Sequence, residues 1–422
     1  MSTRTDARIV RGTPAFRRTN LAMFSAGFST FALVYCVQPL MPELARTFRV
    51  TAATSALSLS LTTGVLAGAL LVVGGLAESW GRKPIMAASL LAAALLTLVT
   101  AAVPSWRALL ALRAVEGLAF AGLPALAMAY LGEEIDPGSI GLAMGLYIGG
   151  TALGGMSGRL LTAALADVAS WRAAVATVGA LGVVAAGVFA RSLPPSRHFR
   201  ARPLALGTSL AAYRTHLGDG RLLLLFCEAF LLMGSFVAAY NYLGFRLLAP
   251  PYSLRQSAAG AVFLAYLVGV GSSSWVGALA GRVGRPAALR GSVALMLAGV
   301  ALTTARPLTV VVCGVVVLTF GFFGAHSVAS SWVGLTAHTA KAQASSLYLF
   351  FYYLGASVAG WFGGICWSAL GWNGVAAFIA AMLAAALVMS SGLGARDSAL
   401  GFGLPQPSRE PRAPSPDTPN GT

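Results

Sequence analysis

Residues 74–83 read GGLAESWGRK, and a similar segment, GALAGRVGR, follows at residues 277–285. Three positions match at a constant spacing of 203 residues: Gly74, Gly81 and Arg82 recur as Gly277, Gly284 and Arg285. Each copy joins two long apolar stretches, so each predicts a tight glycine turn between two closely packed helices. A glycine series recurs as well: Gly150, Gly155 and Gly158 match Gly355, Gly360 and Gly363. The chain therefore contains two similar halves.

The composition places both halves in a membrane. The 422 residues are 57% hydrophobic and only 10% charged, with a mean hydropathy of +0.76, whereas soluble domains are about 25% charged. A membrane helix needs about 20 mostly apolar residues. Twelve stretches qualify: 20–41, 55–77, 84–103, 107–131, 140–164, 172–192, 222–244, 257–280, 286–305, 308–332, 343–367 and 372–392. The sequence predicts an all-α polytopic membrane protein with twelve transmembrane helices in two six-helix, pseudo-symmetric halves.

The basic residues orient this bundle. With the N-terminus in the cytoplasm, 20 of the 29 Lys and Arg residues fall on the cytoplasmic side and seven on the other. This excess satisfies the positive-inside rule and accounts for the net charge of +16. We expect a cytoplasmic N-tail (1–19), a six-helix half (20–192), a cytoplasmic linker (193–221), a second six-helix half (222–392) and a disordered cytoplasmic C-tail (393–422).

Several functions are excluded or disfavoured by the residues. Neither lysine precedes Ser or Thr, so the chain lacks a Walker A motif. The four cysteines lie in apolar runs, and the four histidines are scattered, so we expect no disulfide framework, no metal site and no cofactor. No basic stripe lies on a soluble domain, so no nucleic acid is expected. An enzyme is not expected, and we expect a monomer.

The turn motif identifies a family. Gly74, Glu78, Gly81, Arg82 and Lys83 resemble the loop motif G-x-x-x-D-R-x-G-R-[RK] of the major facilitator superfamily, with Glu78 in place of its Asp. The segments 228–247 and 343–360 are similar to those of the YnfM-type permeases of that superfamily, which are linked by name to acriflavine sensitivity. The resemblance implies the major facilitator fold and a bacterial inner-membrane location. It also implies a gate role for these five residues, although a plain loop anchor remains the alternative.

Charged residues at membrane depth are the candidates for proton coupling. Arg113 and Glu116 lie one helical turn apart, either as a structural pair or as a proton-linked switch. Glu228 lies alone in its stretch, and an unpaired carboxylate at that depth is costly as an anion. We predict that Glu228 carries the proton while Arg113 and Glu116 respond. A snorkelling acid or an acidic cargo contact remains open for Glu228.

Six further residues are candidates for the cargo cavity. Arg159 follows the first glycine series and is expected either to pair with Glu116 or to line an anion site. Gln38, before Pro39, suggests a helix break with a polar group at it. The others have packing or interface roles as alternatives; they are His326, Tyr240, Asn241 and Tyr352.

The sequence thus predicts a secondary transporter that binds protons and a small-molecule substrate within the lipid bilayer. The first hypothesis is proton-coupled efflux of small amphipathic compounds by alternating access. The alternative is a proton symporter that takes up a small organic anion or sugar, which the two buried arginines would suit.

Overall fold

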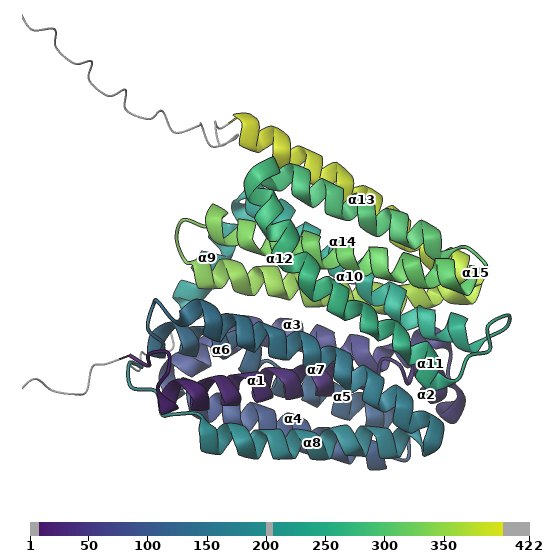
Figure 1. The fold of residues 1–422 in the computed structure, drawn as a ribbon, viewed down its shortest axis with the longest axis horizontal. Helices are drawn as coiled ribbons and strands as arrows, with labels where there is room; N and C mark the ends of the chain where they lie inside the picture. Colours follow the sequence, from purple (N-terminus) through teal and green to yellow (C-terminus); the bar gives the residue numbers. More distant parts are fainter. Residues whose placement is uncertain (1–7, 200–205, 400–422) are drawn as a thin grey trace, which may run out of the picture.

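The protein is a bundle of long helices in two groups. The computed structural model describes residues 8–199 and 206–399, apart from the side chains of 74–79, 206 and 394–399. The lower group in Figure 1 holds the first eight helices. They are α1 (Pro14–Tyr35), α2 (Met41–Phe48), α3 (Ala52–Trp80), α4 (Arg82–Ala102), α5 (Trp106–Phe120), α6 (Gly122–Glu134), α7 (Ile140–Val168) and α8 (Trp171–Ser192).

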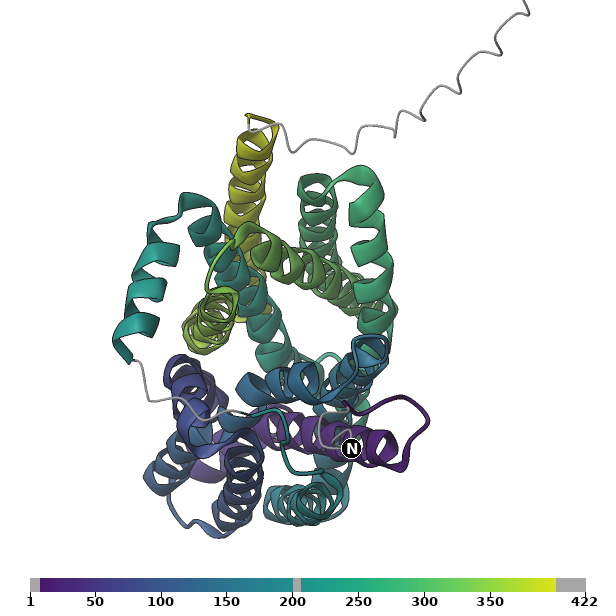
Figure 2. The ribbon, with the colours of Figure 1, turned by 90° about the vertical axis from the view of Figure 1, so that its left-hand side faces the viewer.

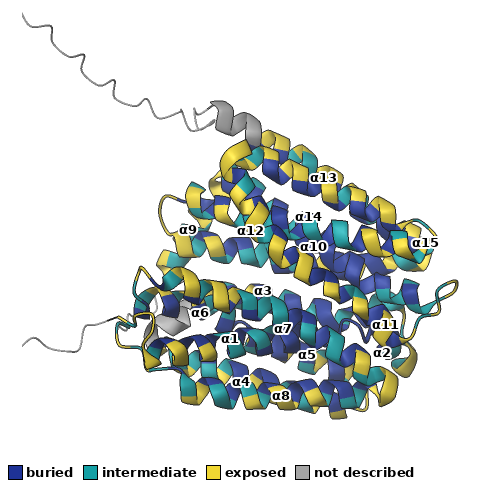
Figure 3. Cartoon of the chain, viewed as in Figure 1, coloured by how far each residue is buried: buried dark blue, intermediate teal, exposed yellow. Residues whose placement is uncertain are grey.

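The upper group in Figure 1 follows the linker and its helix α9. Its elements are α9 (Leu206–Gly218), α10 (Gly220–Leu248), α11 (Gln256–Gly260), the 3-10 helix η1 (Ala261–Leu264), α12 (Ala265–Val283), α13 (Arg285–Thr303), α14 (Leu308–Thr336) and α15 (Lys341–Ala399). Exposed residues lie on the outer helices of both groups (Figure 3), and they include large apolar ones such as Leu95 and Val184 in the first group and Val388 in the second. Such faces suit contact with lipid tails.

The all-helical membrane architecture is confirmed, but the count of twelve spans is not reproduced one for one. Ten helical runs in the described residues are long and apolar enough to cross a membrane. The tenth, Lys341–Leu393, covers two predicted spans and bends at Gly371, where φ is 59°. The first predicted span, 20–41, is absent from the ten because polar residues such as Arg17, Arg18 and Asn20 lower the hydropathy of α1.

The two motif copies form the same turn in each half. Gly81, between α3 and α4, has φ 91°, and Gly284, between α12 and α13, has φ 86°. A side chain at such φ values is strained, so glycine is needed at both turns. The sequence repeat therefore corresponds to a repeat in backbone geometry.

The two ends of the bundle differ. One end, named here the linker end, carries α9, the first described residues and both glycine turns (Figure 2). The other, named the α2 end, carries α2 and α11 (Figure 1). Contacts between the halves include α3 with α15 and α7 with α11. The Ser357 hydroxyl donates to Ser60 O at 2.6 Å, and Gly260 lies against Ala163. These contacts lie toward the α2 end.

Glycines set the helix spacing within each half. A Cβ at Gly154 in α7 would come within 1.9 Å of Phe28 O in α1. In the second half, a Cβ at Gly355 in α15 would come within 2.2 Å of Phe230 O in α10. Both glycine series therefore let two backbones touch, which is a packing role.

Replacing Gly154 with alanine should destabilise the protein, because the new methyl group forces α1 and α7 apart. Overpacking of this kind costs about 1–3 kcal/mol. Gly149 lies in the same helix with no atom within 4 Å of a built Cβ, so Gly149→Ala is the matched control. Thermal unfolding in detergent should show a lower Tm for Gly154→Ala alone. Equal Tm values for the two variants would contradict the packing role.

Candidate functional site

Arg113 and Glu116 form a closed ion pair inside the first half. Both side chains are fully buried, and Arg113 Nη1 contacts Glu116 Oε2. The other guanidinium nitrogens donate to Ser58 O and Val34 O, each at 2.8 Å. Glu116 Oε1 accepts from the Thr100 hydroxyl at 2.7 Å. All three Arg113 nitrogens therefore have partners, and its charge is balanced by Glu116.

Arg159 is buried between residues of both halves and forms a different set of contacts. Its Nε donates to Gln38 Oε1 at 2.5 Å, and its Nη1 donates to Gly155 O at 2.6 Å. The amide of Gln38 then donates to Asn241 Oδ1 at 2.8 Å. This chain of hydrogen bonds links α7, the turn after α1, and α10, so it crosses from one half to the other. Pairing of Arg159 with Glu116, one of the two predicted options, does not occur.

The break predicted at Gln38 and Pro39 is present. Helix α1 ends at Tyr35 and α2 begins at Met41, with turns between them. Because proline cannot continue the backbone ladder, the chain opens here and the Gln38 side chain reaches between the halves. The predicted span 20–41 is therefore not one continuous helix but a helix followed by a turn.

An aromatic column fills the inner face of the second half. Tyr240 hydrogen-bonds to Thr319 Oγ1 at 2.7 Å, and its ring contacts Phe236 at a centroid distance of 4.8 Å. His326 Nδ1 lies 2.9 Å from the Tyr348 hydroxyl. The His326 ring is 4.8 Å from that of Tyr352. The predicted residues Tyr240, His326 and Tyr352 thus lie on one surface, formed by α10, α14 and α15.

Glu228 is buried near the other end of this column. Its side chain is in α10, about 12 Å along the helix from Gly220 at 1.5 Å per residue. Both carboxylate oxygens are buried, and neither has a hydrogen-bond partner within residues 8–199 and 206–399. Tyr348 and Cys227 are titratable residues close enough for a charge on Glu228 to act on them.

Among the predicted gate residues, Arg82 and Lys83 have described side-chain contacts within the first half and with the start of the linker. Arg82 donates through Nε to Glu133 Oε2 at 2.6 Å, and its Nη2 contacts Glu133 Oε1. Lys83 donates to Leu193 O, after α8. Gly81 supplies the turn. The predictions for Gly74 and Glu78 fall on side chains outside those that the structure describes.

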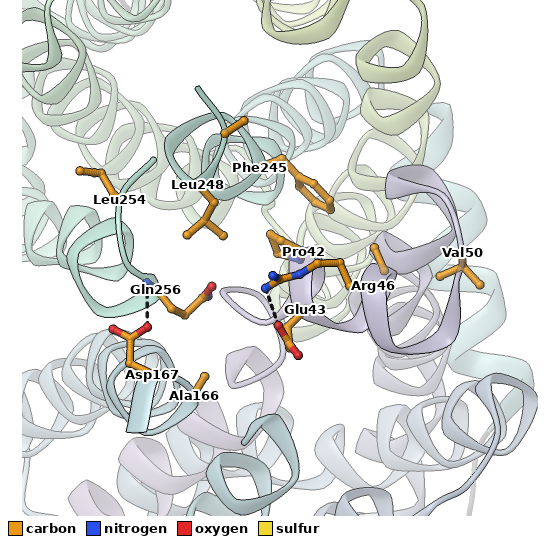
Figure 4. A pocket seen from close by; sticks show the side chains of 12 residues that line it. Pro42, Glu43, Arg46, Val50, Ala166, Asp167, Phe245, Leu248, Leu254 and Gln256 are labelled. Atoms are coloured by element: carbon orange, nitrogen blue, oxygen red, sulfur yellow. Dashed lines mark hydrogen bonds and ion pairs between the residues drawn. The ribbon is translucent and has the colours of Figure 1, made fainter. Parts of the chain in front are cut away.

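The α2 end holds the halves together through Asp167. Its two carboxylate oxygens accept from the backbone N–H groups of Gln256 at 2.9 Å and Ser257 at 2.8 Å, at the start of α11. The Gln256 side chain also donates to Pro39 O. Beside these bonds lies a cavity of about 560 Å³ (Figure 4), with both halves in its wall. Its lining includes Glu43, Arg46, Asp167, Phe245, Leu248 and Gln256.

Comparison with known proteins identifies the fold and family. A family model described as Major Facilitator Superfamily matches residues 23–360. The chain belongs to the major facilitator superfamily. It is 50% identical over 382 residues to the uncharacterized MFS-type transporter YybF of Bacillus subtilis, covering 90% of this chain and 95% of that one. It is 47% identical over 385 residues to the inner membrane transport protein YnfM of Escherichia coli, covering 91% and 92%.

Solved structures agree on the fold of this facilitator. A bacterial homologue of the human lysosomal transporter Spinster, in an inward-facing and unoccupied conformation, superposes with a TM-score of 0.72 at 15% identity. The match covers 93% of this chain and 97% of that one. The resemblance seen in the motif is thereby confirmed. The facilitator is a multi-pass membrane protein whose family carries out secondary transport, and its relatives are transporters rather than enzymes.

Sequence reasoning missed several contact residues of the facilitator. Tyr35, Phe263 and Tyr266 surround the Arg159 guanidinium, and Glu133 binds Arg82. Tyr35 lies about one helical turn before Gln38, and this spacing could have indicated that both side chains approach Arg159. Asp167 lay at the edge of a span, but nothing in the sequence paired it with residue 256, which is 89 positions away.

Removing the Asp167 carboxylate should loosen the closed α2 end of the facilitator. Loss of a helix N-cap costs about 1 kcal/mol, or roughly a fivefold population change. We expect a cysteine at buried Ala259, in a cysteine-free background, to react several times faster with a polar maleimide in Asp167→Ala. Asp136, which accepts from Gly138 N within its own loop, provides the control Asp136→Ala. An unchanged labelling rate in Asp167→Ala would contradict the role of Asp167 in holding the two halves together at the α2 end.

Proposed function

We propose that this facilitator is a proton-coupled secondary transporter that exports small amphipathic compounds by alternating access. The observation that carries the proposal is the state of Glu228, which is buried with both oxygens unpaired in the described structure. An ionised carboxylate in such a place lacks water and partner alike, so its charged form is costly. Glu228 would hold a proton while it is buried and release the proton when the bundle opens and exposes its carboxylate to water.

Alternating access is supported by where the halves touch. Their hydrogen bonds at Asp167, Gln256 and Ser357 lie toward the α2 end. Glu228 lies in the part of α10 nearer the linker end. In the proposed cycle these contacts break as the linker end closes, and Glu228 then meets the opposite compartment. Gly74, Glu78, Gly81, Arg82 and Lys83 would form the gate at the linker end.

A second candidate is uptake of a small organic anion together with a proton. Arg159 favours it, because its buried guanidinium has no carboxylate partner among the described residues. In this case the cargo would supply the missing negative charge. The two candidates differ in the direction of proton movement relative to cargo, which can be measured directly.

The test uses purified protein in proteoliposomes that contain a trapped pH-sensitive dye. Antiport predicts that an external probe enters when the lumen is acidic, with protons leaving. Symport predicts entry when the lumen is alkaline, with protons entering. Ethidium serves as the amphipathic cation and p-aminohippurate as the organic anion. Probe flux that ignores both gradients would exclude proton coupling, and flux equal to protein-free liposomes would contradict the proposed cargo class.

The proposed orientation places both termini and the linker in the cytoplasm of a bacterial inner membrane. We expect a membrane-impermeant maleimide added to intact cells to label Thr47→Cys in the last turn of α2, but not Thr208→Cys in α9. Both positions are exposed in the structure, and the native cysteines are removed first. Thr208→Cys should react after the membrane is permeabilised. The reverse pattern would overturn the charge-based orientation.

A further inference from the structure

Arg113 and Arg159, the two buried arginines among the described residues, differ in whether a carboxylate balances their positive charge. Arg113 has bonds from all three nitrogens and an ion pair with Glu116. Arg159 is 2% exposed, yet its two hydrogen-bond acceptors, Gln38 Oε1 and Gly155 O, are both neutral. Its Nη2 has no hydrogen bond within the described part of the chain. Arg113 is therefore a completed structural unit, whereas Arg159 retains an uncompensated positive charge.

Aromatic rings offset this charge only in part. The guanidinium carbon lies 4.0 Å from the ring centre of Tyr35, 4.9 Å from that of Tyr266 and 5.2 Å from that of Phe263. Cation–π contacts are weaker than an ion pair with a carboxylate. The rings also provide flat apolar faces, and those of Tyr240 and Phe236 continue the surface. A ligand that joins an anion to a planar ring would match both features.

The location of Arg159 suits a cargo site. Tyr35 and Gln38 belong to the first half, whereas Phe263 and Tyr266 belong to the second. The guanidinium therefore lies where the halves must separate and meet again during alternating access. A structural cation would be better placed within one half, as Arg113 is, because its partners would then keep their positions during transport.

We propose that Arg159 binds the anionic group of the cargo and that the cargo is a small aromatic carboxylate. The proposal rests on the transport function above and names its substrate class. The carboxylate would accept from Arg159, including its unused Nη2, and replace part of the π contact. The ring of the cargo would stack on the aromatic faces beside it. Arginine suits this role because its planar fork matches a carboxylate.

The test measures equilibrium binding to the purified full-length protein in detergent, without a pH gradient. Three probes share one ring and differ in charge: benzoate, benzamide and benzamidinium. We expect benzoate to raise the Tm of the wild-type protein, with an apparent affinity at least tenfold higher than that of benzamide. Benzamidinium should bind no better than benzamide. No preference for benzoate, or a preference for benzamidinium, would overturn the proposal.

Variants then locate the site. Arg159→Gln should lose the preference for benzoate, whereas Arg159→Lys should keep a reduced one. Arg172 also lies over an aromatic ring, Trp171, at 4.3 Å, but near the α2 end, so Arg172→Gln should bind benzoate as the wild type does. Benzoate binding that persists in Arg159→Gln would overturn the assignment. If Arg159→Gln does not fold, the wild-type probe series and Arg159→Lys still decide, since a wild-type affinity in Arg159→Lys argues against a bidentate site.

Failure of this proposal is distinguishable from failure of proton coupling. Loss of the charge preference with intact gradient-driven flux would reject the aromatic carboxylate and leave the coupling mechanism standing. Intact benzoate binding with flux that ignores the pH gradient would reject the coupling and leave the Arg159 site standing.

Discussion

Replacing Glu228 with glutamine is expected to abolish transport driven by a pH gradient while counterflow exchange of cargo continues. Glutamine has nearly the same shape and stays neutral, so it mimics the protonated acid and fits the same buried place. Exchange of labelled for unlabelled cargo requires no net proton movement. Because Glu228 has no hydrogen-bonded partner in the described structure, its loss should leave the fold intact and affect coupling alone.

The measurement compares gradient-driven accumulation with counterflow in the same proteoliposomes. Accumulation should fall to the level of protein-free liposomes, whereas counterflow should remain within about twofold of the wild type, which corresponds to less than ~0.5 kcal/mol. Glu43→Gln is the control, because Glu43 is a partly exposed carboxylate paired with Arg46 at the α2 end. If Glu228→Gln still concentrates cargo, the proton carrier lies elsewhere, with Glu116 and then His326 as the next candidates.

Replacing Arg113 with alanine is expected to eliminate both gradient-driven transport and counterflow. Glu116 would become a buried acid without its cation, and Ser58 O and Val34 O would lose their donor. Breaking a buried ion pair from one side costs about 3–5 kcal/mol. The variant should therefore show a much lower Tm, together with loss of activity at equal protein level.

A double variant separates the charge from the shape. Arg113→Met with Glu116→Met removes both members, so that no unpaired charge remains, and replacing such pairs by apolar residues is often neutral for stability. We expect the Tm of the double variant to recover above that of Arg113→Ala. If Arg113→Ala keeps the wild-type Tm and counterflow rate, the pair has neither the structural nor the responsive role assigned to it.

Local features were predictable from the sequence because they depend on nearby residues. The glycine turns at Gly81 and Gly284 follow from a backbone conformation that other residues adopt only with strain. The contact between Arg113 and Glu116 follows from their spacing on one helix face. The break at Gln38 and Pro39 follows from the missing proline N–H.

Contacts between distant segments were not predictable. Arg159 is met by rings from α1, η1 and α12, and no periodicity relates these segments to α7. The same holds for Arg82 and Glu133, which lie 51 residues apart. The two span counts differ because α15 continues through the bend at Gly371 as one helical run, although the sequence predicts two spans there, and because α1 is more polar than the ten runs that qualify.

The contact at Asp167 has a consequence for how this region tolerates substitution. The donors are the backbone N–H groups of residues 256 and 257, which every amino acid except proline provides. Side chains at these two positions can therefore vary without removing the donors. The acceptor, by contrast, is a single carboxylate. Substitutions that weaken this contact should therefore concentrate at position 167. At positions 256 and 257, only proline should have the same effect as loss of the Asp167 carboxylate, because it removes the backbone N–H.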